Sequence, residues 1–130
     1  MWAPNSKTVK MTEFENPKRY DLEERTLQFA KDTIAFIKGI QKTIINLELV
    51  KQLVRSSTSV GANFIEANEA LSKKDFLLRI KICRKEARES IYWLKLVELK
   101  DQESDRIREA LIEEATQLVK IFSTIVERAK

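Results

Sequence analysis

The chain has 130 residues, of which 43% are hydrophobic and 34% are charged, and its formal net charge is +4. This length is enough for one compact domain and too short for two of ordinary size. Because the chain has no histidine and only two glycines, the composition excludes Ser-His and Cys-His nucleophile pairs, Glu-x-x-His metal sites and glycine-rich phosphate loops.

Residues that form turns are scarce, and both prolines, Pro4 and Pro17, lie near the start of the chain. We therefore expect an all-α protein with few, long helices. The single cysteine, Cys83, cannot form an intrachain disulfide, so we expect a cytoplasmic protein. No apolar run approaches the roughly 18 residues that a membrane span needs, so we expect no membrane partner.

Residues 1–20 lack hydrophobic periodicity and are interpreted as a flexible N-terminal tail. The first helix is predicted at about 21–39, with Asp21 as its N-cap and Gly39 at its end. We expect its buried stripe to consist of Leu27, Ala30, Ile34 and Ile37, with Phe29, Phe36 and Ile40 in a second stripe beside it.

The second helix is predicted at about 46–71, with an inner row of Leu47, Val50, Leu53, Val54, Val60, Phe64 and Leu71. Gly61 interrupts this row, and a glycine there favours close approach of another helix. The third helix, about 73–100, begins after Ser72, whose spacing to Asp75 resembles a capping box. The fourth, about 105–129, has Ser104 as its expected cap. Residues 21–130 are thus predicted to form an antiparallel up-down-up-down four-helix bundle.

The third helix carries more hydrophobic surface than one bundle core needs. Its inner row runs through Phe76, Ile80, Cys83, Ala87, Ile91, Leu94 and Val97. A second row, which we call the seam, is offset to one side and consists of Leu78, Ile82, Trp93 and Leu96. Because a monomeric bundle helix needs only one such row, we expect the seam to be an oligomer interface.

A polar stripe on the second helix is the next candidate site. Ser59, Asn63 and Glu66 share one azimuth, and Arg55 lies near them. Polar groups beside an apolar row need partners when they are buried. We interpret the stripe as a hydrogen-bond network, within or between subunits, that involves Lys85, Glu86 or Arg88. A small-ligand site is the alternative.

Positive charge is concentrated on the third helix. Residues 72–100 contain nine basic and four acidic side chains, whereas acids outnumber bases from residue 101 onward. The basic residues form a ridge, with Arg84 beside it, that consists of Lys74, Lys81, Lys85, Arg88 and Lys95. Such a ridge is a candidate nucleic-acid contact, and a solvated face is the alternative, because Glu89 could neutralise Lys85.

The stretch from Gln52 to Glu98, QLVRSSTSVGANFIEANEALSKKDFLLRIKICRKEARESIYWLKLVE, resembles the four-helix-bundle proteins encoded in intervening sequences of bacterial 23S ribosomal RNA genes. The resemblance covers nearly all of residues 20–98 and is carried by Ser59, Asn63, Glu66 and Ala67 together with Lys85, Glu86 and Trp93. It implies a bundle assembled as a ring, a homopentamer. A more distant fold relative is the accessory protein of diversity-generating retroelements, which binds nucleic acid.

Taken together, the sequence predicts a self-assembling helical bundle that is not an enzyme, has no metal and no cofactor, and presents the basic ridge to RNA or DNA. The alternative is a protein-protein interaction scaffold without nucleic-acid binding, in which the seam receives a different protein.

Overall fold

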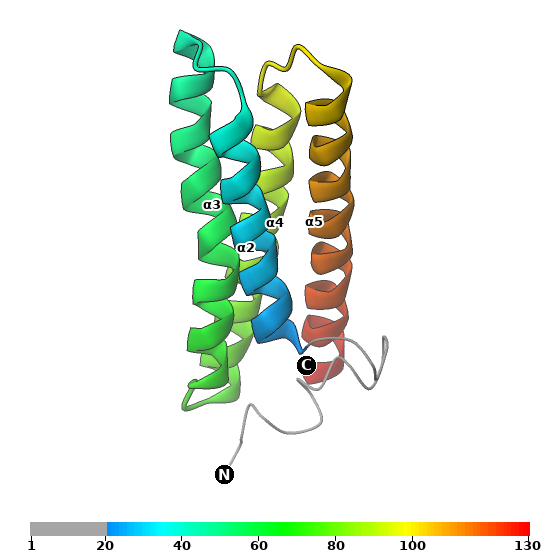
Figure 1. The fold of residues 1–130 in the computed structure, drawn as a ribbon. Coiled ribbons are helices and arrows are strands. Elements are labelled where there is room, and N and C mark those ends of the chain that lie inside the picture. The colour runs from blue at the N-terminus through cyan, green and yellow to red at the C-terminus, as the bar shows by residue number, and fades with distance from the viewer. Residues whose placement is uncertain (1–20) are drawn as a thin grey trace.

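The computed structural model describes residues 21–130, and the predicted tail, residues 1–20, lies outside the described part. The described residues form four helices, α2 (Leu22–Gly39), α3 (Ile44–Asn68), α4 (Lys73–Leu96) and α5 (Gln102–Ala129). Figure 1 shows that the chain reverses its direction at each of the three short links. The predicted all-α four-helix bundle is confirmed.

Each helix begins at a side chain that accepts a hydrogen bond from a backbone N–H of the first turn. The carboxylate of Asp21 accepts from Glu24, and the hydroxyl of Ser72 accepts from Asp75, so both predicted caps are confirmed. Helix α3 begins after Thr43, earlier than expected. Asp101, not Ser104, caps α5, and the backbone N–H of Ser104 is the donor, at 2.7 Å.

Helix ends also differ from the predicted ranges. Helix α3 ends at Asn68 and α4 ends at Leu96, so both are shorter at their C-terminal ends than the hydrophobic pattern indicates. Leu71, expected in the inner row of α3, lies in the link and is almost fully exposed. Leu47 and Val54 of the same row are also exposed. Periodicity continues into a link whenever link residues happen to be apolar, so it overestimates helix length.

The core runs along the axis of the bundle. Helix α3 packs most extensively on α4, α4 on α5, and α2 on α3, whereas the contact between α2 and α5 is the least extensive. The largest fully buried side chains include Phe29 of α2, Leu53 of α3, Phe76 of α4 and Phe122 of α5. All four helices therefore contribute to one core.

The buried stripe of α2 is not the one expected. Leu27 is 53% exposed, and Ala30, Ile34 and Ile37 are only half-buried, whereas Phe29, Phe36 and Ile40 are buried. Two buried threonines, Thr26 and Thr33, complete the inner face of α2, and each donates its hydroxyl to a carbonyl of its own helix. Both apolar stripes satisfy helical spacing, and the positions of α3 and α5 decide which one is buried.

Gly61 marks a close crossing of α2 and α3, as the sequence predicts. A Cβ atom at this position would lie 2.9 Å from Oγ1 and 3.3 Å from Cβ of Thr26. Real Cβ atoms essentially never come so close to another heavy atom. The glycine therefore lets α2 pack tightly against α3.

Asn46 ties two links together at one end of the bundle. Its Nδ2 donates to the carbonyls of Gln41 and Glu98, both at 2.9 Å, and its Oδ1 accepts from the backbone N–H of Glu98 at 2.8 Å. The side chain is buried, so these bonds satisfy groups that water does not reach. The α2–α3 link is thus fixed to the segment after α4.

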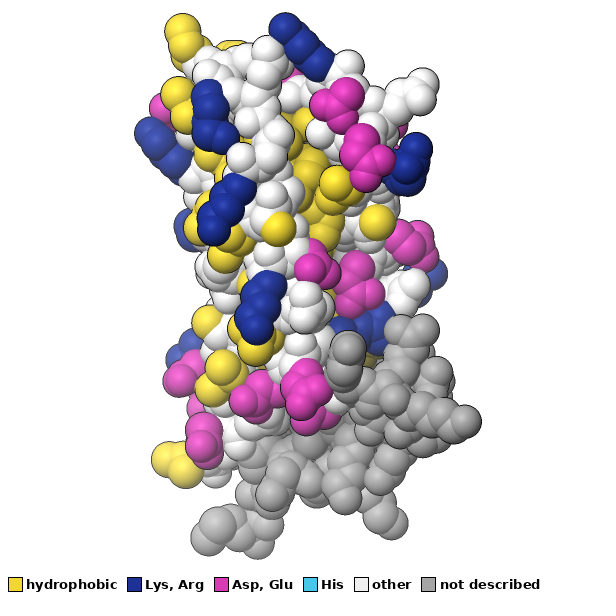
Figure 2. Space-filling view, viewed as in Figure 1, with side chains coloured by type: hydrophobic (Ala, Val, Ile, Leu, Met, Phe, Trp, Pro, Cys, Tyr) yellow, Lys and Arg dark blue, Asp and Glu magenta, His cyan; other side chains and the backbone are white. Residues whose placement is uncertain are grey.

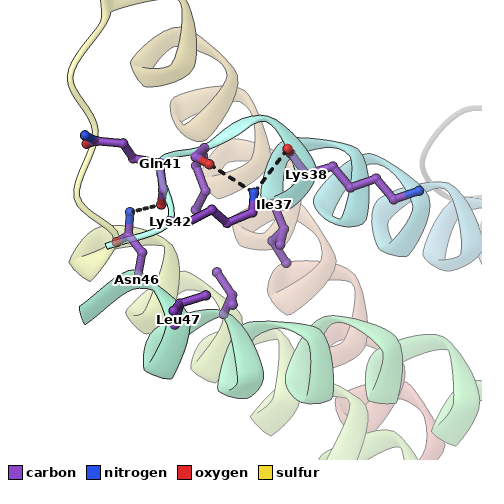
Figure 3. A pocket seen from close by; sticks show the side chains of 8 residues that line it. Ile37, Lys38, Gln41, Lys42, Asn46 and Leu47 are labelled. Atoms are coloured by element: carbon purple, nitrogen blue, oxygen red, sulfur yellow. Dashed lines mark hydrogen bonds between the residues drawn. The ribbon is translucent and has the colours of Figure 1, made fainter. Parts of the chain in front are cut away.

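Beside Asn46 lies a largely apolar groove of about 380 Å³, shown in Figure 3. Its lining consists of Ile37, Lys38, Ile40, Gln41, Lys42, Asn46, Leu47 and Val50. The Nζ atom of Lys42 donates to the carbonyls of Lys38 and Ile40, and so caps the C-terminal end of α2. This groove therefore belongs to the link between α2 and α3, where the side chains of Lys42 and Asn46 bond to backbone.

Candidate oligomer and nucleic-acid interface

The seam lies on the solvent side of α4. Leu78 is 54% exposed and Leu96 is 44% exposed, whereas Ile82 and Trp93 are half-buried. Tyr92, which is also exposed, contacts Trp93 edge to face, with ring centroids 5.0 Å apart. One copy of the chain thus leaves part of the seam uncovered, although Trp93 packs partly against its own core.

Trp93 also carries an unsatisfied polar atom. Its Nε1 is buried, and no acceptor lies within hydrogen-bonding distance among residues 21–130. Buried indole N–H groups usually have a partner, because an unpaired donor away from water costs free energy. At this part of the seam, the described residues of one chain therefore do not supply a hydrogen-bond acceptor for the indole N–H of Trp93.

An ion-pair cluster interrupts the seam between Ile82 and Trp93. The guanidinium of Arg55 donates to both oxygens of Glu86, at 3.1 and 3.2 Å, and to Glu89 at 2.6 Å. Desolvation alone lowers the pKa of Arg55, but the charges and hydrogen bonds of Glu86 and Glu89 outweigh it, and the pKa is raised. The cluster holds two carboxylates and one guanidinium, so it joins α3 to α4 and leaves an excess negative charge.

The polar stripe of α3 continues from this cluster. The hydroxyl of Ser59 donates to the carbonyl of Arg55 at 2.6 Å, and the Nδ2 of Asn63 donates to the carbonyl of Ser59 at 2.9 Å. The Oδ1 of Asn63 accepts from Arg79 of α4 at 3.1 Å. Glu66 is exposed at the end of the stripe. The structure therefore brings Arg55, Ser59, Asn63 and Glu86 together by bonds within one chain.

Of the three alternative partners expected for this stripe, the structure brings one into the network. Glu86 is a partner, but the exposed side chains of Lys85 and Arg88 take no part in the network. Arg79 and Glu89 take part instead. Helical spacing places Arg79 on the same side of α4 as Glu86, because seven residues return close to one azimuth, but the seven-residue periodicity does not indicate which residue of α3 lies opposite.

The basic ridge of α4 is exposed. Its five members, Lys74, Lys81, Lys85, Arg88 and Lys95, form no ion pair with the described residues. Arg84, beside the ridge, is half-buried and donates to the hydroxyl of Ser123 on α5 at 3.4 Å. Glu89 pairs with Arg55 and not with Lys85. The positive charge of the ridge is therefore not neutralised locally.

The described residues contain no cluster of candidate metal ligands, and their one thiol lies in the core. Residues 21–130 contain no group of three or more Cys, Asp or Glu side chains arranged to hold a metal ion. Cys83 is fully buried, and burial raises the pKa of its thiol to about 12. A thiol in this state is a core side chain, because the reactive thiolate is scarcely populated at neutral pH.

Two polar contacts of α3, one with α4 and one with the segment after it, were not predicted from the sequence. The hydroxyl of Ser90 donates to that of Ser56 at 2.9 Å in the core, and Asn46 bonds to Glu98 as described above. Ser56 lies three residues after Leu53, and Ser90 lies three residues after Ala87. This helical spacing places each serine on the inner face of its helix, beside an apolar residue. That spacing is the signal that could have identified them.

Comparison with family models places residues 18–124 in the family described as 23S rRNA-intervening sequence protein. The match covers most of the chain. The chain belongs to the 23S rRNA-intervening sequence protein family. The resemblance noted in the sequence is thereby confirmed.

A crystal structure of another protein supports this membership. It is a protein of unknown function from the S23 ribosomal protein family of Bacteroides thetaiotaomicron, which is 32% identical to this chain. The two structures agree with a TM-score of 0.69 over 82% of this chain and 98% of that chain. A comparison with curated proteins found no match.

Neither comparison names an enzymatic activity for this member of the 23S rRNA-intervening sequence protein family. Within residues 21–130, no helix combines the length and the apolar composition that crossing a bilayer requires. The seam and the ridge lie on α4, and the ion-pair cluster joins α4 to Arg55 of α3. These are the surfaces from which a function is argued.

Proposed function

We propose that this protein is a self-assembling helical bundle without enzymatic activity, whose ring-like homo-oligomer presents the basic ridge of α4 to RNA or DNA. The observation that carries the proposal is the division of the outer side of α4 into two neighbouring stripes. One stripe is the partly exposed seam, and the other is the exposed basic ridge.

Self-assembly is supported by what the seam leaves uncovered. Leu78, Tyr92 and Leu96 are each more than two-fifths exposed, and the indole N–H of Trp93 is unpaired among the described residues. Burying contiguous apolar surface gains roughly 25 cal/mol per Å². A second copy of the chain is present in any solution of the protein and could bury the exposed surface of the seam. A ring would repeat this contact between each pair of neighbouring subunits.

Nucleic-acid binding is supported by the charge of the ridge. Lysine and arginine side chains at helical spacing can follow a line of phosphates, and they release counterions when they bind. One subunit with a net charge of +4 binds only weakly in this way. Repetition of the ridge around an oligomer multiplies weak contacts, because each further contact becomes intramolecular.

The nucleic-acid part is tested with two variants of equal charge. Lys81→Glu with Arg88→Glu reverses two charges of the ridge, whereas Lys31→Glu with Lys120→Glu reverses two exposed lysines on α2 and α5. We expect structured RNA to bind wild type and the control in a salt-sensitive manner. The ridge variant should bind more weakly, with a salt slope smaller by about one unit per lost phosphate contact.

Equal loss of binding in both variants would contradict a specific role for the ridge. The self-assembly part is tested separately by the mass of wild type in light scattering. We expect a mass of several subunits for wild type and a lower mass for Leu96→Glu, because a charge in the seam opposes its burial. A well-folded wild-type monomer would contradict self-assembly.

The second candidate is a protein-protein interaction scaffold without nucleic-acid binding. The exposed seam favours it as much as it favours self-assembly, because apolar surface can be covered by a different protein. A stable wild-type monomer that binds no RNA at low salt would favour this alternative.

A further inference from the structure

An exposed aromatic ring lies among the cations of the ridge. Tyr92 of α4 is 58% exposed. Every phenylalanine of residues 21–130 is buried, and Trp93 is half-buried. Tyr92 is thus the one ring of the described residues that a molecule outside the bundle can contact over a wide area.

Helical spacing places Tyr92 within the ridge. At about 100° per residue, Tyr92 lies about 20° from Lys85 and about 40° from Arg88 around the axis of α4, and about 60° from Lys95. At about 1.5 Å per residue, Arg88 lies about 6 Å from Tyr92 along the axis in one direction, and Lys95 lies about 4.5 Å away in the other. Both cations are exposed. The ring therefore has an exposed cation on each side of it along the helix.

Trp93 restrains the ring of Tyr92. The two ring centroids are 5.0 Å apart, and the ring planes are inclined at 73°. An edge-to-face contact occupies at most one face of a ring, so the other face of Tyr92 is open to water. Trp93 packs against the core, so the contact connects Tyr92 to a fixed part of the bundle. The exposed ring is thus oriented in advance and loses little conformational entropy when another ring stacks on it.

The cations that flank Tyr92 are available to an anion. Arg88 and Lys95 form no ion pair with residues 21–130. The carboxylates of the ion-pair cluster bond to the guanidinium of Arg55 on α3. Glu89 of this cluster lies about 100° from Arg88 around the axis of α4. An anionic chain along the ridge therefore reaches Tyr92 on the side that faces away from the cluster.

The ring and the straightness of the ridge favour a single strand over a duplex. Paired bases stack on one another, so a duplex offers no free base face to a ring outside it. The strands of a duplex also wind around its axis, whereas the ridge runs straight for about 30 Å from Lys74 to Lys95. A duplex would meet the ridge only where one of its strands crosses it. A flexible single strand can follow the ridge and place an unpaired base on Tyr92.

We propose that the ridge binds an unpaired segment of RNA or DNA, with one base stacked on the open face of Tyr92 and the flanking phosphates at Arg88 and Lys95. Every base has a π-face, so the site accepts single strands of mixed sequence. The proposal rests on the nucleic-acid binding proposed above. It adds that Tyr92 is the residue that distinguishes single strands from duplexes.

Fluorescence anisotropy at low salt tests the proposal with three labelled probes that carry equal numbers of phosphates. The probes are a single-stranded DNA of mixed sequence, a strand of the same length made of abasic sites, and a fully paired duplex. Wild type should bind the base-containing strand most tightly. Tyr92→Ala should weaken its binding about fivefold or more and leave binding of the abasic strand nearly unchanged. Tyr92→Phe keeps the ring and should bind like wild type.

A matched control and an RNA probe complete the measurement. Leu27→Ala removes an exposed side chain of α2, which is 53% exposed, and should change the binding of no probe. A single-stranded RNA of the same sequence should depend on Tyr92 as the DNA does, because neither stacking nor the phosphate contacts use the 2′-hydroxyl. Dependence on Tyr92 in one of the two strands alone would support the proposal and identify that strand as the ligand.

The outcomes separate this inference from nucleic-acid binding itself. Equal weakening of the base-containing and abasic strands by Tyr92→Ala would overturn the stacking role, because a loss of fold or assembly affects both strands alike. A duplex that binds as tightly as the single strand, and loses binding when the ridge is reversed in charge, would overturn the inference and leave the proposed function intact. Absence of binding by every probe would overturn both.

Photocrosslinking locates the stacked base independently of affinity. A single strand with one 5-iodouracil reacts under irradiation with an aromatic ring stacked on it. Peptide mass spectrometry after trypsin should place the adduct on Tyr92, in the peptide from Glu89 to Lys95. Tyr92→Phe should keep an adduct at this position, and Tyr92→Ala should lose it. Adducts of wild type confined to other residues would overturn the inference.

Discussion

The two opposite sides of the bundle are held together differently. Side-chain hydrogen bonds join α3 to α4 at Arg55–Glu86, Ser56–Ser90 and Asn63–Arg79. Asn46 adds a tie to Glu98, two residues beyond the end of α4. Between α2 and α5 the hydrogen-bonded contacts that the structure shows are those of Arg25 with Glu114 and Gln117. A groove of about 370 Å³ lies beside them, and hydrophobic side chains are visible between the two helices (Figure 2).

The difference follows from the topology. Helices α3 and α4 are neighbours in the chain and are joined by a short link, so their contacts form at little cost in chain entropy. Helices α2 and α5 are the first and last of the described helices, and their contact closes the bundle. We infer that the α3/α4 side carries most of the specificity of the fold, whereas the less tightly closed α2/α5 side leaves surface for another molecule.

The largest expected effect comes from breaking the tie at Asn46. Asn46→Ala removes a buried side chain together with its three hydrogen bonds to the backbone of Gln41 and Glu98, so we expect a loss of about 3 kcal/mol in the free energy of unfolding. Urea unfolding of wild type and variant measures this loss in free energy. Asn68→Ala, at the other end of α3, is the control and should cost much less. Equal losses in the two variants would show that the hydrogen bonds of Asn46 contribute no more to stability than an ordinary residue of α3.

The next effect concerns how α2 is held against α3. Gly61→Ala gains helix propensity but places a Cβ atom 2.9 Å from Oγ1 of Thr26, so we expect a net loss of about 1 to 2 kcal/mol in the free energy of unfolding. Gly39→Ala is the matched control, because a Cβ atom there meets nothing within 4 Å. It should not destabilise the protein.

Thermal or urea unfolding of both glycine variants, and of Gly61→Ala combined with Thr26→Ala, completes this test. Removal of Oγ1 relieves the closest contact, so the double variant should recover part of the loss. A stabilising effect of Gly61→Ala would mean that α2 and α3 are not in close contact at this crossing.

A smaller effect is expected on the α2/α5 side. Arg25 and Glu114 form a two-bond ion pair, at 2.8 and 3.0 Å, in which the Arg25 side chain is only 11% exposed. A double-mutant cycle of Arg25→Ala and Glu114→Ala should give a coupling energy of about 1 kcal/mol. The exposed pair Arg106–Glu103 is the control, with a coupling close to zero. Equal couplings would contradict the importance of the Arg25 pair in closing the bundle.

The smallest effect is a dependence on pH at the start of α5. The backbone N–H of Ser104, and then its hydroxyl, hold the pKa of Asp101 below its ordinary value. A lowered pKa means that the carboxylate stabilises the fold at pH above its ordinary pKa, and that this contribution is lost as the pH falls through the lowered value.

Asp101→Asn keeps a side-chain oxygen for the cap and removes the charge. Its melting temperature should be a few degrees below that of wild type at neutral pH, and the difference should shrink in the acid range. Measurements of thermal unfolding by circular dichroism over this range test it. A difference that does not change with pH would show that the charge of Asp101 does not contribute.

Much of the architecture could be predicted because it depends on local chemistry. Asp21 and Ser72 are caps for reasons contained within a few residues of each. Helix α2 ends at Gly39 as expected, but Ile40 is the C-cap and Gly39 has no positive φ, so the end does not depend on a left-handed glycine. The inner row of α4 is likewise correct, since Phe76, Ile80 and Leu94 are fully buried. The N-cap of α5 was wrong, because Asp101 and Ser104 are both good capping residues and local preference does not choose between them.

The candidate site was predicted in part. The polar stripe contains Arg55, Ser59 and Asn63 as expected, and the structure adds Arg79 and Glu89 as their partners. Those partners depend on how α3 and α4 are offset along their axes. The roles of the seam and the ridge as interface and nucleic-acid contact stay predictions, and the light-scattering and RNA-binding experiments above test them.

By itself the sequence determined the number of helices, most of their boundaries and the presence of excess apolar surface on α4, since these follow from periodicity and from capping within each segment. Only the tertiary structure decided that Phe29 and not Leu27 enters the core, that Asn46 meets Glu98, and that the α3/α4 side of the bundle lies opposite the α2/α5 side. The physical reason is that helical spacing states which side chains share a face, whereas the packing of the other three helices decides where that face points.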